Sequence, residues 1–578
     1  MKTGIQIHIF LVPCFRRDGV WTPAFARVTA FLTFYETIKY GDLRKEKEMS
    51  KAIKVLASDN LTPEGKAILE QAPGIEADIR AKTSADELKT IIKNYHGLIV
   101  RSATKVTAEI IAAADNLRVI GRAGTGVDNI DLAAASKKGV VVMNTPGGNT
   151  LSAAEHTLSM ILALARHIPQ ATASIKAGRW EKDRFMGTEI GDRTLGIIGL
   201  GNIGAVVAQH AESLGMKVIG YDPYLSPEVA AKKKVELVAL EDLCARADFI
   251  TLHIPLTSST KNFLNASSFA KMKKGVRIIN CARGGIIDEM ALHEAIVGGK
   301  VAGAALDVFE KEPPGKNPLL ELDQVICTPH LGAATTQAQV KVSVGIAEQL
   351  VEYLLQGTAR HAVNLPSVSP ETLAFLNPYL LLAEKMGKFQ AQLNAGRISE
   401  VHLTYSGSIV DMDTPMIAMA LLKGLLDPIL EEKVNYVNAP ILARERGIKI
   451  VESTSRESED YTTLLTVQVQ TELSGSTMAG TLFGKHEPRI VRINEFVTEA
   501  VPAGNILFIH NQDKPGVIGN VGGTLASHGI NIGQMHLSRD QIGGTAISLI
   551  HVDGPVSPEV LTSLQGLPYI LSAVQVEL

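Results

Sequence analysis

The chain has 578 residues, which is too long for a single hydrophobic core and favours about three to five domains. Hydrophobic residues make up 46% and charged residues 20%, as in ordinary globular proteins, and the net charge of −3 gives no electrostatic reason to expect nucleic acid or a membrane as a partner. Four cysteines without a C-x-x-C pair argue against a disulfide framework or a metal site and favour the reducing cytoplasm. No apolar run is long enough to span a bilayer.

Residues 1–50 are predicted to be a leader that is disordered or results from an upstream start, and we assign them no function. Their apolar patch, Ile5–Val12, is short for a signal peptide and is not followed by an A-x-A cleavage pattern. The run from Met49 to Leu56 has the pattern of a natural N-terminus that enters a first strand.

Residues 51–148 alternate short apolar segments with helical ones, as α/β domains do. The expected strands are Lys54–Ala57, Gly97–Val100, Arg118–Gly121 and Val140–Asn144. A Thr-Pro-Gly-Gly-Asn sequence at 145–149 then breaks the chain. Ser152 and Glu155 have the spacing of a capping box, which predicts a helix from there to about His167 that connects two domains.

The most specific motif of the chain follows a short apolar strand that begins near Thr194. The sequence Gly-Leu-Gly-Asn-Ile-Gly at 199–204 has the G-x-G-x-x-G spacing and opens a helix. The first glycine allows a tight turn, the second lets the backbone approach a pyrophosphate, and the third lets the helix pack on the strand. The N-terminus of that helix favours the negative charge of the phosphates.

Asp222 completes this motif. It lies eighteen residues after the last glycine, at the end of the next apolar run. A carboxylate at this place fits the ribose hydroxyls of NAD and repels the 2′-phosphate of NADP. We therefore predict an NAD site.

Further strands at regular spacing predict a complete doubly wound dinucleotide-binding domain. The expected strands are Gly196–Gly199, Lys217–Tyr221, Asp248–His253, Val276–Asn280, Gly303–Leu306 and Val325–Cys327.

Polar residues that the fold does not need follow the last three of these strands. They are Arg283, then Asp307 with Glu312, and finally His330. Ligands bind at the carboxyl ends of the strands in open α/β sheets, so these residues are candidates for the chemistry of a dehydrogenase. His330 would transfer the hydroxyl proton and Glu312 would orient its imidazole. Arg283 would hold a substrate carboxylate and polarise the reacting carbonyl.

The C-terminal part of the chain has a different pattern. Residues 365–503 contain alternating strands, such as Glu400–Tyr405 and Leu464–Gln470, with many turns and no evident catalytic constellation. Residues 504–578 show the order strand, helix, strand, strand, helix, strand, which is the ferredoxin-like βαββαβ plan. We expect two separate domains here.

Five motifs identify a family when they are taken together. They are Gly-Arg-Ala-Gly-Thr-Gly-Val-Asp-Asn-Ile-Asp at 121–131, the glycine-rich turn at 199–204, Asn-Cys-Ala-Arg-Gly-Gly-Ile-Ile-Asp at 280–288, Ala-Ala-Leu-Asp-Val-Phe at 304–309 and Pro-His-Leu-Gly-Ala at 329–333. With them the chain resembles the D-isomer-specific 2-hydroxyacid dehydrogenase family, and within it the long-type phosphoglycerate dehydrogenases, which add two C-terminal domains. The resemblance covers residues 52–578, and its last module is similar to the ACT domain.

The resemblance implies the fold class and the domains. A Rossmann doubly wound dinucleotide-binding domain is expected to be inserted in a flavodoxin-like substrate domain, followed by an α+β intervening domain and a βαββαβ ACT domain. The implied bounds are 51–148 plus 332–362 for the substrate-binding domain, 149–331 for the NAD-binding domain, 365–503 for the intervening regulatory domain and 504–578 for the ACT domain. The implied activity is NAD-dependent oxidation of 3-phospho-D-glycerate to 3-phosphohydroxypyruvate, the first step of L-serine biosynthesis, in a cytoplasmic homodimer or homotetramer under possible control by L-serine.

The resemblance also implies roles for single residues. The catalytic three are Arg283, Glu312 and His330. Substrate contacts are expected from Arg101, Ser102, Arg122 and Arg283. Cofactor contacts are expected from Thr125, Gly199, Gly201, Asn202, Ile203, Gly204, Asp222, Ala282, Asp307, His330 and Gly332. Trp180 is expected to anchor a subunit interface.

Contacts to an L-serine effector are expected from Asn511, Asp513 and Asn531. Asp513 would bind the amino group, and the two asparagines would bind the carboxylate or the hydroxyl. The surrounding sequences, Asp-Lys-Pro-Gly and Gly-Ile-Asn, are equally ordinary turn formers, and both interpretations stay open.

Two other functions remain alternatives at this point. One is another D-2-hydroxyacid dehydrogenase on the same fold, such as a glyoxylate or hydroxypyruvate reductase, and the pair of C-terminal domains argues against it. The other is a non-catalytic NAD-sensing regulator, against which the ACT-like module weighs.

Overall fold

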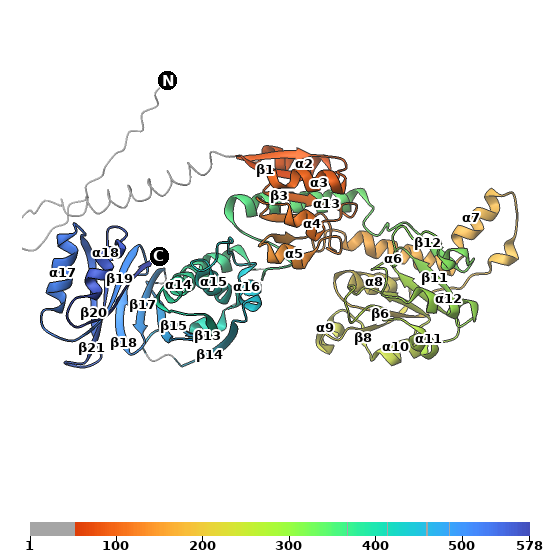
Figure 1. The fold of residues 1–578 in the computed structure, drawn as a ribbon. Helices are drawn as coiled ribbons and strands as arrows, with labels where there is room; N and C mark the ends of the chain where they lie inside the picture. The colour runs from red at the N-terminus through yellow and green to blue at the C-terminus, as the bar shows by residue number, and fades with distance from the viewer. Residues whose placement is uncertain (1–51, 367, 413, 458–459, 485) are drawn as a thin grey trace, which may run out of the picture. The chain divides into compact units, whose positions relative to one another are not determined.

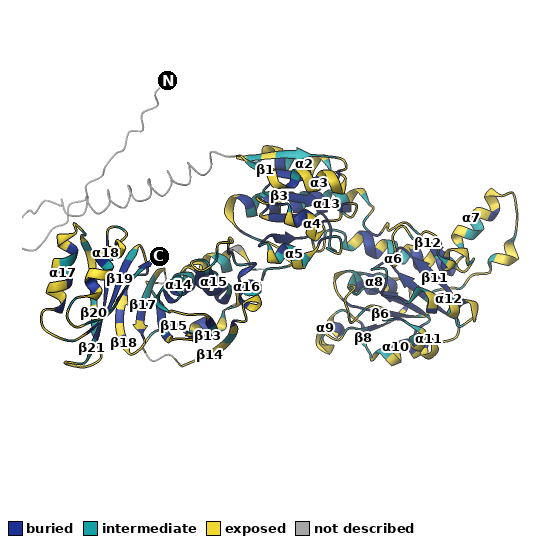
Figure 2. Ribbon diagram, viewed as in Figure 1, coloured by how far each residue is buried: buried dark blue, intermediate teal, exposed yellow. Residues whose placement is uncertain are grey.

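The computed structural model describes residues 52–578, apart from 367, 413, 458–459 and 485. The predicted leader at 1–50 therefore lies outside the described residues. Four sheets follow one another along the described chain (Figure 1). Buried residues are concentrated along the strands and on the helix faces that cover them (Figure 2).

The first sheet has five strands in the order β2-β1-β3-β4-β5, the flavodoxin-like order. Its strands are β1 (Ile53–Ala57), β2 (Ile75–Ile79), β3 (Gly97–Val100), β4 (Val119–Arg122) and β5 (Val141–Met143). The helices in this segment are α2 (Pro63–Gln71), α3 (Ala85–Ile91), α4 (Ala108–Ala112) and α5 (Leu132–Lys137), with the 3-10 turn η1 (Ile92–Asn94).

Strand β2 was absent from the sequence prediction. It reads Ile-Glu-Ala-Asp-Ile, and its residues are half-buried or exposed because it forms the edge of the sheet. An edge strand with alternating charges lacks the continuous apolar run that revealed the buried strands.

The chain returns to the first sheet after the second one, through α13 (Thr336–Gln356). This helix contacts α2, β3 and β4 (Figure 1). Gly97 and Gly121 make the close approach possible, because a Cβ atom on either would lie about 3.0 Å or less from the side chains of Leu350 or Ile346. The second sheet is thus inserted in the first unit, as expected.

The second sheet has seven strands in the order β12-β11-β10-β9-β6-β7-β8, and its pairs are parallel. The strands are β6 (Thr194–Ile198), β7 (Lys217–Tyr221), β8 (Glu236–Leu237), β9 (Phe249–Leu252), β10 (Val276–Asn280), β11 (Val301–Leu306) and β12 (Val325–Cys327). The helices are α8 (Asn202–Ser213), α9 (Pro227–Lys232), α10 (Leu240–Arg246), α11 (Ala266–Lys271) and α12 (Glu289–Val297), with η3 (Pro318–Glu321). The strand order reverses beside β6, as in a doubly wound dinucleotide-binding sheet, and the two-residue β8 adds to the six predicted strands.

Between the two sheets lie α6 (Thr150–Ala165), α7 (Ile168–Lys176) and η2 (Lys182–Phe185). The predicted capping box is wrong, because α6 begins at Thr150 and its N-cap residue is Asn149. The Ser152 hydroxyl donates instead to the carbonyl of Gly332 at 2.9 Å.

The third sheet has six strands in the order β14-β13-β15-β16-β17-β18. Its strands are β13 (Ile398–Gly407), β14 (Lys449–Ser455), β15 (Thr463–Thr471), β16 (Gly475–Phe483), β17 (Glu487–Ile493) and β18 (Phe496–Ala500). Its helices are α14 (Pro370–Leu393), α15 (Pro415–Leu426) and α16 (Ala439–Glu445), with η4 (Ser408–Asp411). The β13–β14 pair is parallel and the other pairs are antiparallel, which gives an α+β unit.

The fourth sheet has the order β20-β21-β19-β22. Its elements are β19 (Asn505–Gln512), α17 (Val517–Ser527), β20 (Ile532–Arg539), β21 (Thr545–Val552), α18 (Pro558–Gln565) and β22 (Ile570–Glu577). This is the predicted βαββαβ plan. Across the described residues, no helix has both the length and the apolar character needed to cross a membrane.

Candidate active site

The carboxyl ends of β3, β4, β10, β11 and β12 meet at one cavity of about 1360 Å³. This is the edge at which ligands bind in parallel α/β sheets. The predicted residues that line the cavity are Arg101, Ser102, Arg122, Thr125, Ile203, Ala282, Arg283, Asp307, Glu312, His330 and Gly332. The structure thus brings together all predicted catalytic and substrate-contacting residues.

His330 and Glu312 form a hydrogen-bonded pair in this cavity. The distance from His330 Nδ1 to Glu312 Oε2 is 2.8 Å, and the other carboxylate oxygen accepts from the backbone N–H of Phe309 at 3.2 Å. Burial acts to raise the pKa of Glu312, but the hydrogen bond and charge of His330, together with the hydrogen bond from Phe309, outweigh burial and leave that pKa below its usual value. Glu312 is therefore ionised at neutral pH and fixes the imidazole through Nδ1, which leaves Nε2 free for proton transfer.

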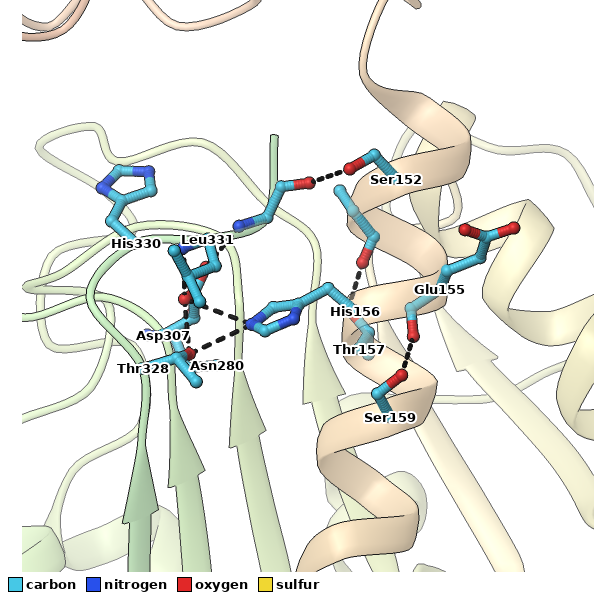
Figure 3. Close-up of polar contacts among 12 residues, drawn as sticks. Ser152, Glu155, His156, Thr157, Ser159, Asn280, Asp307, Thr328, His330 and Leu331 are labelled. Atoms are coloured by element: carbon cyan, nitrogen blue, oxygen red, sulfur yellow. Dashed lines mark hydrogen bonds and ion pairs between the residues drawn. The ribbon is translucent and has the colours of Figure 1, made fainter. Parts of the chain in front are cut away.

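Asp307 fastens the loop that carries His330 (Figure 3). Its buried carboxylate accepts from the hydroxyl of Thr328 at 2.6 Å and from the backbone N–H groups of Leu331 at 2.7 Å and Gly332 at 2.9 Å. Its carbonyl accepts from the N–H of His330 at 2.9 Å. These bonds hold His330 at a φ of 57°, a left-handed conformation that costs a non-glycine residue free energy.

Arg283 is held in place by two hydrogen bonds. Its Nε donates to Asp128 Oδ2 at 2.8 Å, and its Nη1 donates to the carbonyl of Ala282 at 2.7 Å. The guanidinium lies in the cavity wall with its side chain 29% exposed, so part of its surface stays accessible to a ligand.

Arg101 and Arg122 add two more cations to the same cavity. Arg101 donates to the carbonyl of Asn60 at 3.1 Å and to the side chain of Gln339. The Arg122 Nε atom is buried and has no hydrogen-bond partner among the described residues. Burial, and after it the charge of Arg283, lowers the pKa of Arg122 to about 10. A partly unpartnered cation beside two others favours a ligand that carries more than one negative charge.

The glycine-rich turn at the end of β6 fits a dinucleotide. Gly199 has a φ of 94°, and a Cβ atom there would lie 2.5 Å from the carbonyl oxygen of His253. A Cβ on Gly204 would lie 2.0 Å from the carbonyl oxygen of Gly199, whereas a Cβ on Gly201 would meet no atom within 4 Å. Two glycines are thus required by packing, and the third faces open space beside the N-terminus of α8, where a pyrophosphate fits.

Asp222 ends β7 beside this turn. Its carboxylate accepts from the N–H groups of Leu200 at 2.9 Å and Tyr224 at 3.0 Å. The cavity lining includes neither Asp222 nor the predicted residues of the turn other than Ile203. The remaining predicted cofactor residues, Gly199, Gly201, Asn202 and Gly204, thus lie outside this lining together with Asp222, and their contacts to a cofactor stay a prediction.

The three predicted effector residues lie at the ends of strands of the fourth sheet. Asp513 accepts from the N–H of Gly543 at 3.0 Å and from Arg539 Nη1 at 3.3 Å. The Asn531 amide donates to Asp553 at 3.0 Å, and Asn511 is buried with its Oδ1 lacking a partner among the described residues.

Several residues of the site were not predicted from the sequence. Asp128 lies in the glycine-rich motif at 121–131, and its position within that motif was the available signal. Thr328 immediately precedes the Pro-His motif. His156 and Gln339 lie within apolar helices, where a polar residue gives no sign of a tertiary partner.

Three family models match successive parts of the chain. The model described as D-isomer specific 2-hydroxyacid dehydrogenase, NAD binding domain, matches residues 158–332. The D-3-phosphoglycerate dehydrogenase intervening domain matches residues 375–494, and the ACT domain matches residues 505–569. The order of the three agrees with the predicted architecture.

Among solved structures, a glyoxylate reductase from Paecilomyes thermophila is 27% identical, with a TM-score of 0.51, and the match covers 54% of this chain and 98% of that chain. The TT0316 protein from Thermus thermophilus is 32% identical, with a TM-score of 0.50, over 54% of this chain and 100% of that chain. Both are similar to about half of the present chain.

Longer relatives cover nearly all of it. The D-3-phosphoglycerate dehydrogenase of Archaeoglobus fulgidus is 46% identical over 529 residues, which are 91% of this chain and 100% of that protein. The D-3-phosphoglycerate dehydrogenase of Bacillus subtilis is 42% identical over 526 residues, 91% of this chain and 99% of that protein. Since relatives of this identity span the dehydrogenase, intervening and ACT regions alike, the chain belongs to the D-3-phosphoglycerate dehydrogenase family.

Proposed function

We propose that the chain catalyses the NAD-dependent oxidation of 3-phospho-D-glycerate to 3-phosphohydroxypyruvate, the first step of L-serine biosynthesis. The observation that carries the proposal is the arginine cluster of Arg101, Arg122 and Arg283 around one cavity that also holds a His–Glu pair. A substrate with both a carboxylate and a phosphate supplies the charges that three guanidinium groups require.

The arginines divide the substrate between them. Arg283 follows β10 of the second sheet and lines the same cavity as His330, and we assign it the carboxylate and the oxygen of the reacting carbon. Arg101 and Arg122 end strands of the first sheet, and we assign them the phosphate, with Ser102 as a further donor. Binding of the phosphate would give Arg122 Nε the partner it lacks.

His330 acts as the general base in the direction of oxidation. Its Nε2 accepts the proton of the substrate hydroxyl, and the carboxylate of Glu312 stabilises the imidazolium that forms. Bound NAD would supply the hydride acceptor for the carbon that carries this hydroxyl. Thr125, Ala282, Asp307 and Gly332 line the cavity beside His330, where they would position the reacting end of the cofactor.

Asp222 sets the preference for NAD. Its carboxylate is fixed by two backbone N–H groups at the end of β7, where it would accept hydrogen bonds from the ribose hydroxyls. A 2′-phosphate at the same place would meet its negative charge. We expect Asp222→Ala to lower the ratio of kcat/KM with NAD to kcat/KM with NADP by about tenfold or more.

We further infer L-serine as an effector, a homodimer or homotetramer as the assembly, and the cytoplasm as the location. The ACT match supports a small-molecule effector. Cys244, Cys281 and Cys327 are free thiols, which a reducing compartment maintains.

The test is a spectrophotometric assay of NADH formation with 3-phosphoglycerate, D-glycerate and D-lactate as substrates, and of the reverse reaction with glyoxylate and hydroxypyruvate. We expect kcat/KM for 3-phosphoglycerate to exceed the others by at least about 100-fold, and His330→Ala to lower kcat by about 10²–10⁴-fold. A preference for glyoxylate or hydroxypyruvate would instead identify a reductase of the same fold. NAD binding without turnover of any of these substrates would identify a sensor.

A further inference from the structure

A histidine outside the cavity lining contacts the groups that hold the catalytic loop. His156 lies on α6, and its Nε2 is 3.0 Å from the hydroxyl oxygen of Thr328 and 3.2 Å from Oδ1 of Asp307 (Figure 3). Its side chain is 17% exposed, and the carboxylate of Asp307 is fully buried. The proposed roles of the site residues leave His156 without a function.

The hydrogen positions in this group follow from the donors available. The Thr328 hydroxyl has one hydrogen, and the short 2.6 Å bond to Asp307 uses it. The oxygen of Thr328 can then only accept from His156, and an ionised carboxylate can also only accept. His156 Nε2 must therefore carry a hydrogen and act as the donor, whether the ring is neutral or charged.

Asp307 transmits this contact to both sides of His330. Its carboxylate binds Thr328, two residues before His330, and the N–H groups of Leu331 and Gly332 directly after it. Burial acts to raise the pKa of Asp307, but the hydrogen bonds from His156, Thr328 and the N–H of Leu331 together outweigh it and hold that pKa below its usual value. His156 thus helps to keep the central acceptor of the loop ionised.

Helix α6 touches the same loop a second time. The Ser152 hydroxyl donates to the carbonyl of Gly332 at 2.9 Å, and Ser152 and His156 are four residues apart, on one face of the helix (Figure 3). One helix face therefore contacts both Thr328 before His330 and Gly332 after it.

We propose that His156 is a positioning residue for proton transfer, which acts on His330 through Thr328 and Asp307. This inference rests on the proposed role of His330 as the general base. The N–H group at Nε2 of His156 fixes the orientation of the Thr328 hydroxyl and the Asp307 carboxylate. These two groups in turn hold the left-handed backbone of His330 in the geometry that the reaction needs. Proton transfer is sensitive to such geometry, because a misplacement of about 1 Å can cost about 10²-fold in rate.

The first experiment compares His156→Leu with His156→Gln. Leucine preserves much of the volume but has no donor, whereas the glutamine amide places an N–H near the position of Nε2. We expect His156→Leu to lower kcat about 10- to 100-fold with KM for 3-phosphoglycerate changed less than about threefold, because the arginine cluster is untouched. His156→Gln should recover most of the lost kcat. His293→Leu, at a half-buried histidine of α12 outside the cavity lining, is the matched control and should retain full activity.

The second experiment is a double-mutant cycle with Thr328→Val, which removes the intermediate hydroxyl. If His156 acts through Thr328, the double variant His156→Leu/Thr328→Val should be little slower than the slower single variant. Thermal unfolding of each variant shows whether it is folded at the assay temperature.

The proposal is overturned if His156→Leu keeps kcat within about twofold of the parent, if the glutamine and leucine variants are equally slow, or if the losses in the cycle are additive. These outcomes are separable from failure of the proposed function. An active His330→Ala variant would remove His330 as the base, whereas an inactive His330→Ala variant together with an active His156→Leu variant would remove only the role of His156.

Discussion

At the scale of single residues, the His330–Glu312 pair makes the reaction depend on pH. Glu312 is ionised at neutral pH, because the hydrogen bond and charge of His330, together with the hydrogen bond from the N–H of Phe309, outweigh the effect of burial on its pKa. The carboxylate in turn favours the imidazolium, and the base must be neutral to accept a proton from the substrate.

We expect Glu312→Gln to move the acid limb of the kcat/KM profile for oxidation to lower pH and to lower kcat about 10- to 100-fold. The amide keeps the volume of the side chain but no longer stabilises the positive ring, so the base stays neutral at more acidic pH. The measurement is kcat/KM for 3-phosphoglycerate at saturating NAD from about pH 5 to 10. An acid limb at the parental position would show that Glu312 only orients the ring.

His253 makes the folded protein sensitive to acid. It lies in the cavity wall, and burial lowers its pKa to about 4. In the unfolded chain a histidine titrates near about 6.5. Between these two values the unfolded state binds more protons than the folded state, so stability falls as the pH falls.

The protonation of His253 on unfolding lowers the free energy of unfolding at pH 5 by about 2 kcal/mol relative to pH 8. His253→Gln should remove that part of the loss. We expect the decrease in Tm of the cofactor-free protein between pH 8 and pH 5 to be smaller in the variant by a few degrees. An identical decrease in both proteins would show that His253 becomes protonated within the folded state.

At the scale of elements, α7 and the segment after it expose an unusual amount of apolar surface. Ile168, Ile175 and Met186 are exposed, and Trp180 is 85% exposed. A concentration of large apolar side chains on one short segment is typical of an interface. This agrees with the expected role of Trp180 as an anchor, which stays a prediction.

We therefore expect Ile175→Glu and Trp180→Ala, each made separately, to lower the mass of the oligomer measured by sedimentation equilibrium. Alternatively, each should weaken the association of the subunits at least about tenfold. The matched control is Val297→Glu on α12, which also replaces a well exposed apolar residue and should leave the mass unchanged. A monomeric parent protein, or variants with the parental mass, would contradict the assignment of this interface.

Elements also show how far the sequence predicts the structure. The buried parallel strands were predictable, for example the one that contains Ile197 and Ile198. The polar residues that follow β10, β11 and β12 were predictable too, because an apolar run and the polar residues at its end are local patterns. The start of α6 was predicted wrongly, at Ser152, because the Ser152 hydroxyl donates to Gly332, far along the chain, and does not cap the helix. The same reason hid the partner of His156: a sequence shows which donors exist but not which acceptors the fold brings beside them.

At the scale of the whole molecule, the dehydrogenase region is followed by two units that contain none of the predicted catalytic residues. The βαββαβ module at the end carries Asp513, whose carboxylate is held by the N–H of Gly543 and by Arg539. The bond from Gly543, and after it that from Arg539, lowers the pKa of Asp513, so the carboxylate is charged at neutral pH. The predicted domain bounds and the effector role of this module stay predictions.

The ACT module is the part of the chain where we expect the product of the pathway, L-serine, to control the enzyme. If L-serine binds the ACT module through Asp513, it should inhibit by shifting a conformational equilibrium, and such couplings typically change affinity about 5- to 150-fold. We expect Asp513→Ala to raise the L-serine concentration for half inhibition about tenfold or more, because the charged partner of the amino group is lost.

Glu559→Gln, at an exposed acid at the start of α18, is the matched control and should keep the parental value. Turnover without serine reports the integrity of each variant, and calorimetry measures binding directly. An absence of heat at millimolar L-serine would assign the module a structural role, whereas unchanged inhibition in Asp513→Ala would place the amino group elsewhere.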